Sequence, residues 1–141
     1  MCQNVIEKLI HIFQCPHIHE AWVKFLLQFS KWFDITKTSS IISSTIIGAL
    51  LTMSSFSSNL PLSAPQIVVR AAYEQDEIGM FGFLSGKIAT TWVDAYSCLK
   101  KATKSKYQVR SKWGSHLIKK TFAYAYQVWK ARSNKVHEVL D

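Results

Sequence analysis

The sequence predicts an all-α fold, a compact bundle of five or six helices with a long basic C-terminal helix. Along most of the chain, apolar residues recur at steps of three and four, which is the spacing of one helix face. Residues 66–69 form the only short β-branched run that resembles a strand. Apolar residues make up 48% of the chain, with five Gly and three Pro, which suits a folded core and disfavours disorder.

A chain of 141 residues is expected to form a single helical domain over residues 1–141. The Ser- and Pro-rich stretch 54–66 is the clearest loop, and a seam between two halves is expected there.

Two amphipathic helices are expected in the first half of the chain, one over residues 17–33 and one from Thr38 or Ser39 to about residue 53. The first has a heavily aromatic face, made of Trp22, Phe25, Leu26, Phe29, Trp32 and Phe33. The second has a wide apolar stripe, made of Ile41, Ile42, Thr45, Ile46, Ala49, Leu50 and Met53. No charge lies between Lys37 and Arg70, so a membrane span is an alternative. A stripe of thirteen residues is shorter than the roughly twenty that a bilayer needs, which favours a buried helix and no membrane partner.

Three further elements are expected after the loop. A helix over residues 66–77 breaks at Gly79, and a tight turn packed on aromatics follows over 79–86. Another helix is predicted over 87–102, and a basic linker, 100–106, leads into the final helix over 107–137. The final helix has one apolar face, made of Trp113, Leu117, Thr121, Tyr124, Val128 and Ala131. One core is expected to contain Trp22, Phe25, Phe29, Ile42, Ile46, Leu50, Trp92, Leu99, Leu117 and Tyr124.

The net charge of +8 is concentrated at the end of the chain. Residues 100–141 carry eleven Lys or Arg against Glu138 and Asp141, whereas residues 70–99 carry two basic against four acidic residues. Such a segment favours a polyanionic partner, and its alternative is a solvated face that keeps the protein soluble.

We therefore expect non-specific binding of nucleic acid, RNA or DNA, by the basic residues of the last third. They are Lys100, Lys101, Lys104, Lys106, Arg110, Lys112, Lys119, Lys120, Lys130, Arg132 and Lys135. Those on the helix are expected to wrap the side away from Leu117 and Tyr124 as a broad surface, rather than to form one narrow line. Exposed aromatics can add base stacking, although core packing is the expected role for most of Trp113, Tyr124 and Trp129.

No other group of residues predicts a reaction or a cofactor. Cys2, His11, Cys15 and His19 form an incomplete zinc ligand set, so neither metal nor cofactor is expected. Glu74, Asp76 and Glu77 are adjacent in sequence, which is more typical of a solvated face than of paired catalytic carboxylates.

Asp94, Cys98 and His116 contain a thiol and an imidazole, but Cys98 is more simply a small core residue. The sequence contains neither a phosphate-binding glycine loop nor a zinc-protease motif, so no enzymatic activity is expected. Three Cys cannot all pair, and residues 1–15 lack the pattern of a secretory signal, so an intracellular setting is expected.

Three blocks of the sequence resemble parts of one protein family. In the first, Cys2 is followed by Glu7, His11 and Cys15 at steps of four. This pattern resembles the end of the zinc-binding segment that follows many non-LTR reverse transcriptases. The family has two Cys before the Glu, and the first of them is missing here, so the resemblance does not imply a complete zinc site.

The second block contains Gln75, Ile78, Gly79, Phe83, Leu84, Gly86, Ile88 and Trp92, and departs from the family at Met80. The third contains Trp113, Leu117, Ile118, Trp129, Lys130, Ala131, Arg132 and His137, with Ser133 where the family has Asn.

The resemblance implies a retroelement-derived protein, the helical C-terminal tail of a reverse transcriptase polyprotein, or a truncated copy of it. A tail of this kind is expected to associate with template nucleic acid and with a reverse transcriptase, without polymerase activity. The alternatives are a helical protein-interaction module with no nucleic-acid role and a membrane-associated protein that uses the apolar residues 41–53.

Overall fold

The protein is all-α in the parts of the chain that the structure describes. The computed structural model describes residues 19–99 and 106–140, and the side chains of the last helix from residue 112 to residue 130. Within these ranges the elements are α2 (His19–Ile35), α3 (Ser40–Thr52), the 3-10 turn η2 (Ser57–Asn59), α4 (Gln66–Ile78), α5 (Met80–Leu84), α6 (Thr91–Leu99) and α7 (Lys106–Leu140). Six α-helices and no strand in these ranges confirm the predicted all-α class and its long final helix.

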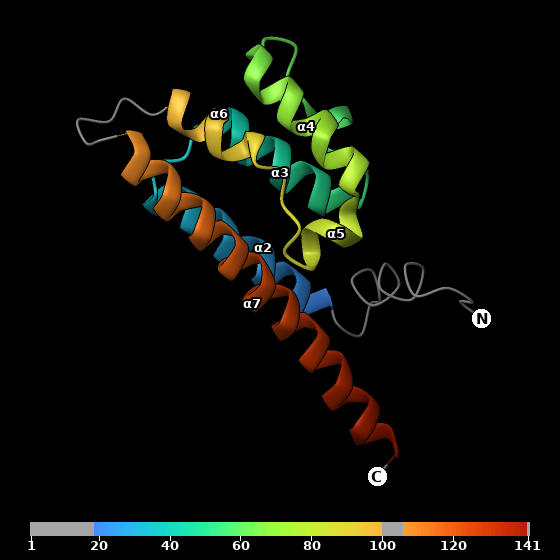
Figure 1. The fold of residues 1–141 in the computed structure, drawn as a ribbon. Helices are drawn as coiled ribbons and strands as arrows, with labels where there is room; N and C mark the ends of the chain where they lie inside the picture. The colour runs from blue at the N-terminus through green and yellow to red at the C-terminus, as the bar shows by residue number, and fades with distance from the viewer. Residues whose placement is uncertain (1–18, 100–105, 141) are drawn as a thin grey trace.

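Helix α7 is the longest element, and the others are arranged along one side of it (Figure 1). It packs on α2 and on α6, while α4 packs on α6 and α3 packs on α2. The last turns of α7 project beyond the rest of the fold, as Figure 1 shows.

The aromatic face of α2 forms the centre of the core. All six residues expected on this face are buried: Trp22, Phe25, Leu26, Phe29, Trp32 and Phe33. Phe29 is fully buried and packs against Phe33 of the same helix, Phe83 of α5 and Tyr124 of α7. The ten residues predicted to share one core do so, with Leu99 and Tyr124 only partly buried at its edge.

Helix α3 is buried along one face and has a defined cap at each end. The Ser39 hydroxyl accepts a hydrogen bond from the Ile41 N–H at 3.3 Å, as predicted for one of the two candidate caps. Met53 closes the other end in the left-handed conformation, with φ of 50°. No helix in the described ranges is both long enough and apolar enough to cross a membrane.

The loop over 54–66 is attached to the core by Phe56. Its ring is buried and lies 5.2 Å from the ring of Phe83 and 6.2 Å from that of Trp92, centroid to centroid. The Asp76 carboxylate accepts hydrogen bonds from the N–H groups of Phe56 and Ser57, at 2.6 and 3.2 Å. The aromatic core and α4 therefore both hold the loop in place.

The segment after α4 differs from its prediction in two ways. The expected turn over 79–86 contains the short helix α5, which begins after Gly79, where φ is 91°. The expected helix over 87–102 begins at Thr91 instead of residue 87, and the structure describes it as far as Leu99.

The side chain of Gln75 explains the late start of α6. It donates to the Lys87 carbonyl at 3.1 Å and accepts from the Ala89 N–H at 2.8 Å. Its carbonyl oxygen also accepts from the Trp92 indole at 3.2 Å. These tertiary bonds hold residues 87–89 in an irregular conformation that local periodicity does not predict.

Candidate nucleic-acid interface

Helix α7 packs on the core through the face that the sequence predicts. Trp113, Leu117, Thr121 and Val128 are buried and Tyr124 is partly buried, while the Ala131 side chain lies outside the described part. The Trp113 ring stacks on Tyr96 at 4.4 Å between centroids, and its indole N–H donates to the Thr38 hydroxyl at 3.0 Å. This contact fixes the rotation of α7 about its axis, and therefore which residues face solvent.

Four lysines lie on the exposed side of the described part of α7. Lys112, Lys119, Lys120 and Lys130 are all exposed, and the sequence from 112 to 130 contains no Asp or Glu. Steps of seven and eleven residues bring a helix back to within about 20° of the same direction. Lys112, Lys119 and Lys130, which we call the lysine row, therefore lie along one line of the helix, about 27 Å long.

The lysine row contains three of the four lysines whose side chains are described. Lys120 stands apart from it, with its ammonium nitrogen 5.9 Å from the centre of the Tyr124 ring. Burial raises the pKa of the Tyr124 phenol above its ordinary value, because desolvation disfavours the phenolate.

The other basic residues expected to contact nucleic acid cannot be placed as side chains. Lys106, Arg110, Arg132 and Lys135 belong to α7, but their side chains lie outside the described part. Lys100, Lys101 and Lys104 lie wholly outside the described residues.

The aromatic residues of α7 divide into a buried and an exposed set. Core packing, which is expected for most of Trp113, Tyr124 and Trp129, is confirmed for Trp113 and for the partly buried Tyr124, whereas the Trp129 side chain is 48% exposed. Phe122 and Tyr126 are exposed by 58% and 53%, and Ile118 by 45%. The sequence prediction missed this exposed set. Its four residues are spaced by four, four and three positions, which is the spacing of a second helical face and could have been read from the sequence.

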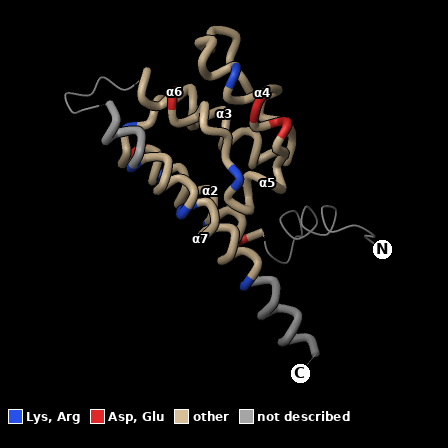
Figure 2. Tube along the Cα trace, viewed as in Figure 1, with Lys and Arg blue, Asp and Glu red and all other residues tan. Residues whose placement is uncertain are grey.

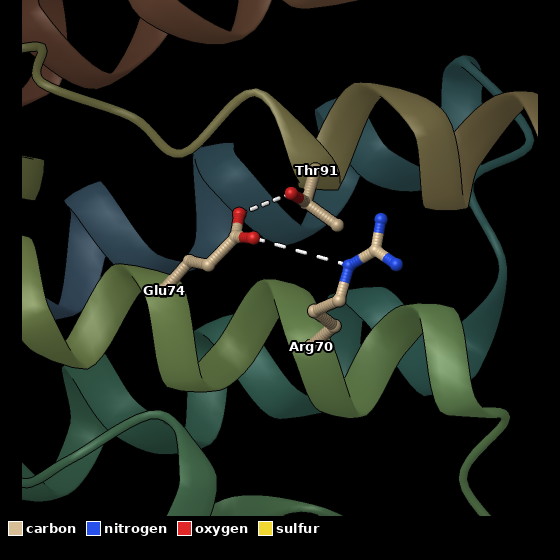
Figure 3. A network of polar contacts seen from close by, with 3 residues as sticks. All are labelled: Arg70, Glu74 and Thr91. Carbon is tan, nitrogen blue, oxygen red and sulfur yellow. Dashed lines mark hydrogen bonds and ion pairs between the residues drawn. The ribbon is translucent and has the colours of Figure 1, made fainter.

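The acidic residues of the described ranges lie on α2, α4 and α6, and none lies on α7 between residues 112 and 130 (Figure 2). Glu74 accepts a hydrogen bond from the Thr91 hydroxyl at the start of α6 and lies 3.9 Å from the Arg70 guanidinium (Figure 3). Asp76 accepts the two loop N–H groups described above. Of Glu74, Asp76 and Glu77, which the sequence predicts to form a solvated face, only Glu77 is exposed to solvent without such a role. The other two carboxylates hold segments of the chain together.

The remaining candidates do not assemble into a site in the described residues. Nowhere in residues 19–99 and 112–130 do three or more His, Cys, Asp or Glu side chains gather as they would around a metal ion. His19 is exposed at the start of α2, and Cys2, His11 and Cys15 lie outside the described part. Cys98 is exposed on α6 rather than a small core residue.

Comparison with known proteins found no match to a protein-family model, to a curated protein or to a solved structure.

Proposed function

We propose that this protein binds nucleic acid without sequence preference through α7, as a non-catalytic helical module. The observation that supports the proposal is the lysine row on an exposed helix face with no acidic residue between positions 112 and 130. Ammonium groups on flexible stems neutralise phosphates regardless of the bases that the phosphates connect. The face therefore suits a phosphate backbone, RNA or DNA, better than a particular base sequence.

The proposal extends to the retroelement resemblance of the sequence blocks. In this proposal the protein is a retroelement-derived tail that holds template nucleic acid beside a reverse transcriptase. The support for a retroelement origin is the sequence blocks themselves. Their residues Trp92 and Trp113 are buried and link α6 and α7 to the core. A shared pattern of core residues supports a shared fold before it supports a shared partner.

A salt titration tests the binding. Labelled oligonucleotides are titrated with the full chain at several ionic strengths, and the dissociation constant is measured by anisotropy. The logarithm of the association constant should fall linearly with the logarithm of salt, by about 0.7 to 0.9 for each phosphate contacted. The double variant Lys119→Glu/Lys130→Glu should weaken binding to every sequence alike and reduce this slope by about 1.4 to 1.8.

The matched control is Lys24→Glu/Lys31→Glu on α2. It changes two exposed lysines on one helix, seven residues apart, and gives the same net charge as the test variant. Equal losses in the two double variants would show that total charge decides the binding rather than the face of α7. If the wild type does not bind at low salt, the nucleic-acid function is wrong, and a protein-interaction module becomes the better description of the exposed face.

A further inference from the structure

The exposed side of α7 carries four large apolar side chains that the fold leaves about half exposed, and of these Ile118 lies beside Gly86 of the segment after α5. Ile118, Phe122, Tyr126 and Trp129, which we call the apolar stripe, are between 45% and 58% exposed. Their steps of four, four and three place them within about 80° of one helix face, over a length of about 16 Å. The other large exposed apolar residues in the described ranges are divided among α2, α3, the loop over 54–66 and α4.

The stripe is separate from the face that holds α7 in the fold. Trp113, Leu117 and Val128 contact the core, and they lie on the other side of the helix. The rings of Tyr126 and Trp129 stack on one another, with centroids 6.2 Å apart and an angle of 28° between their planes. The stripe therefore presents flat aromatic surface to solvent without any structural need for it.

The lysine row borders the stripe at each of its two ends. Lys119 follows Ile118 directly, and Lys130 follows Trp129 directly. At 100° per residue, both lysines lie just beyond the aromatic arc, on its side away from the core. A ligand that fits both rows must combine a line of negative charge with flat apolar groups beside it.

We infer, on the basis of the proposed function, that α7 prefers single-stranded nucleic acid, with unpaired bases stacked on Phe122, Tyr126 and Trp129. A single strand exposes the faces of its bases beside its phosphates, and stacking on aromatic side chains is independent of sequence. A duplex keeps those faces stacked inside, so it offers the lysines its phosphates and gives the rings nothing to contact. A second copy of this chain would bring two lysine rows together, and their repulsion disfavours that occupant.

Trp129 provides a direct measurement of this contact. Trp22, Trp32, Trp92 and Trp113 are buried, so Trp129 is the one exposed tryptophan of the five. The full chain is titrated at fixed low salt with an oligothymidylate of about twelve nucleotides, and separately with a blunt duplex of the same length. Stacking should quench the tryptophan emission with the single strand, and the duplex should leave it nearly unchanged.

The substitution Trp129→Ala should weaken single-strand binding about tenfold, which is the effect of losing one stacked base. Duplex binding should stay unchanged. Trp129→Phe keeps a ring and should restore most of the affinity while losing the quenching. Tyr73→Ala, which removes a 59% exposed ring from α4, is the matched control and should change neither affinity. Far-ultraviolet circular dichroism checks that each variant keeps its helix content.

The outcomes separate the inference from the proposed function. Equal, salt-dependent binding of single strand and duplex, with no effect of Trp129→Ala, would overturn the inference and leave the proposed function standing. Absence of binding to both would overturn the proposed function and the inference with it. A Trp129 response to an acidic amphipathic peptide and none to the oligonucleotide would also overturn the inference, and would assign the stripe to a protein partner.

Discussion

Gln75 joins three segments through one buried amide, and its contacts exceed what its position on a helix predicts. The side chain is fully buried, and it bonds the Lys87 carbonyl, the Ala89 N–H and the Trp92 indole. Because the Ala89 N–H and the Trp92 indole N–H are shielded from water, they have no alternative partner when the amide is removed. The residue therefore links the end of α4 to the start of α6.

Replacing Gln75 with Leu should lower the free energy of unfolding by about 2–4 kcal/mol. The volume is nearly conserved, so the loss comes from orphaned buried polar groups, at about 1–3 kcal/mol each. Urea unfolding followed by circular dichroism measures the change. The same substitution at Gln66, an exposed residue at the start of α4, should change stability by less than about 0.5 kcal/mol. Similar effects at both positions would contradict the role given to the Gln75 amide.

Tyr124 should make the protein less stable at high pH. Desolvation raises its folded-state pKa above the unfolded value of about 10, so the folded state holds the phenolic proton more tightly. Its contribution is fully present below about pH 10 and is lost as the pH rises through the raised folded pKa. Tyr124→Phe removes this proton, so its unfolding free energy should fall less steeply than that of the wild type above pH 10. Parallel curves for the two proteins would contradict the assignment.

At the scale of the elements, the sequence predicts the helices through their core-facing periodicity. All six aromatic-face residues of α2 are buried, and the predicted apolar face of α3 is buried or partly buried throughout. Where a helix begins depends on tertiary contacts, as at α6, where Gln75 from another helix holds the residues before Thr91. Periodicity within one segment contains no information about such a partner.

The candidate site could be predicted in part. The exposure of Lys112, Lys119, Lys120 and Lys130 follows from the buried face of α7, which the sequence predicts. The exposure of Trp129 contradicts the general preference of large aromatics for a core. Trp113 and Trp129 are sixteen residues apart, which separates them by about 160° around the helix, so only a wheel of the whole helix distinguishes them.

The contact between α6 and α7 depends on Gly114. A Cβ atom at this position would lie 2.8 Å from a methyl carbon of Val93, closer than nonbonded carbons approach. Gly114→Ala should therefore destabilise the protein by about 1 kcal/mol, because overpacking outweighs the gain in helix propensity. In a Val93→Ala background the clash is absent, and the same substitution should stabilise by about 0.5–1 kcal/mol. A double-mutant cycle with urea unfolding measures both, and additive effects would contradict direct contact.

At the scale of the whole molecule, one core contains residues from both sides of the loop over 54–66. Phe25 of α2 lies 5.7 Å from the ring of Tyr124 of α7, and Phe56 of the loop packs on Phe83 and Trp92. Helices far apart in the sequence therefore share their buried surface, while the described part of α7, residues 112–130, carries lysines and no acidic residue. The buried face of α7 therefore makes its contacts with the core, and the exposed face lies toward solvent.

Phe25→Ala should cost about 3–5 kcal/mol of unfolding free energy, since it removes a ring that is 1% exposed and leaves a cavity between α2 and α7. The same change at Phe122, which is 58% exposed, should cost less than about 0.5 kcal/mol. Thermal and urea unfolding of the two variants measure the difference. Equal stability of both would contradict the core assignment of α2.

The shared core also predicts that the described helices unfold in one cooperative transition. Trp22, Trp32 and Trp113 report on the packing of α2, α6 and α7, and Trp92 reports on the joint between α4 and α6. If these regions separate together, tryptophan fluorescence and far-ultraviolet circular dichroism should give coincident urea curves in the wild type and in Phe25→Ala. The destabilised variant is the more sensitive case, because weakening α2 would unfold the half that contains α2 first if the two halves folded independently. Two separate transitions, with circular dichroism lost in steps, would contradict a single domain and would support a seam at the loop over 54–66.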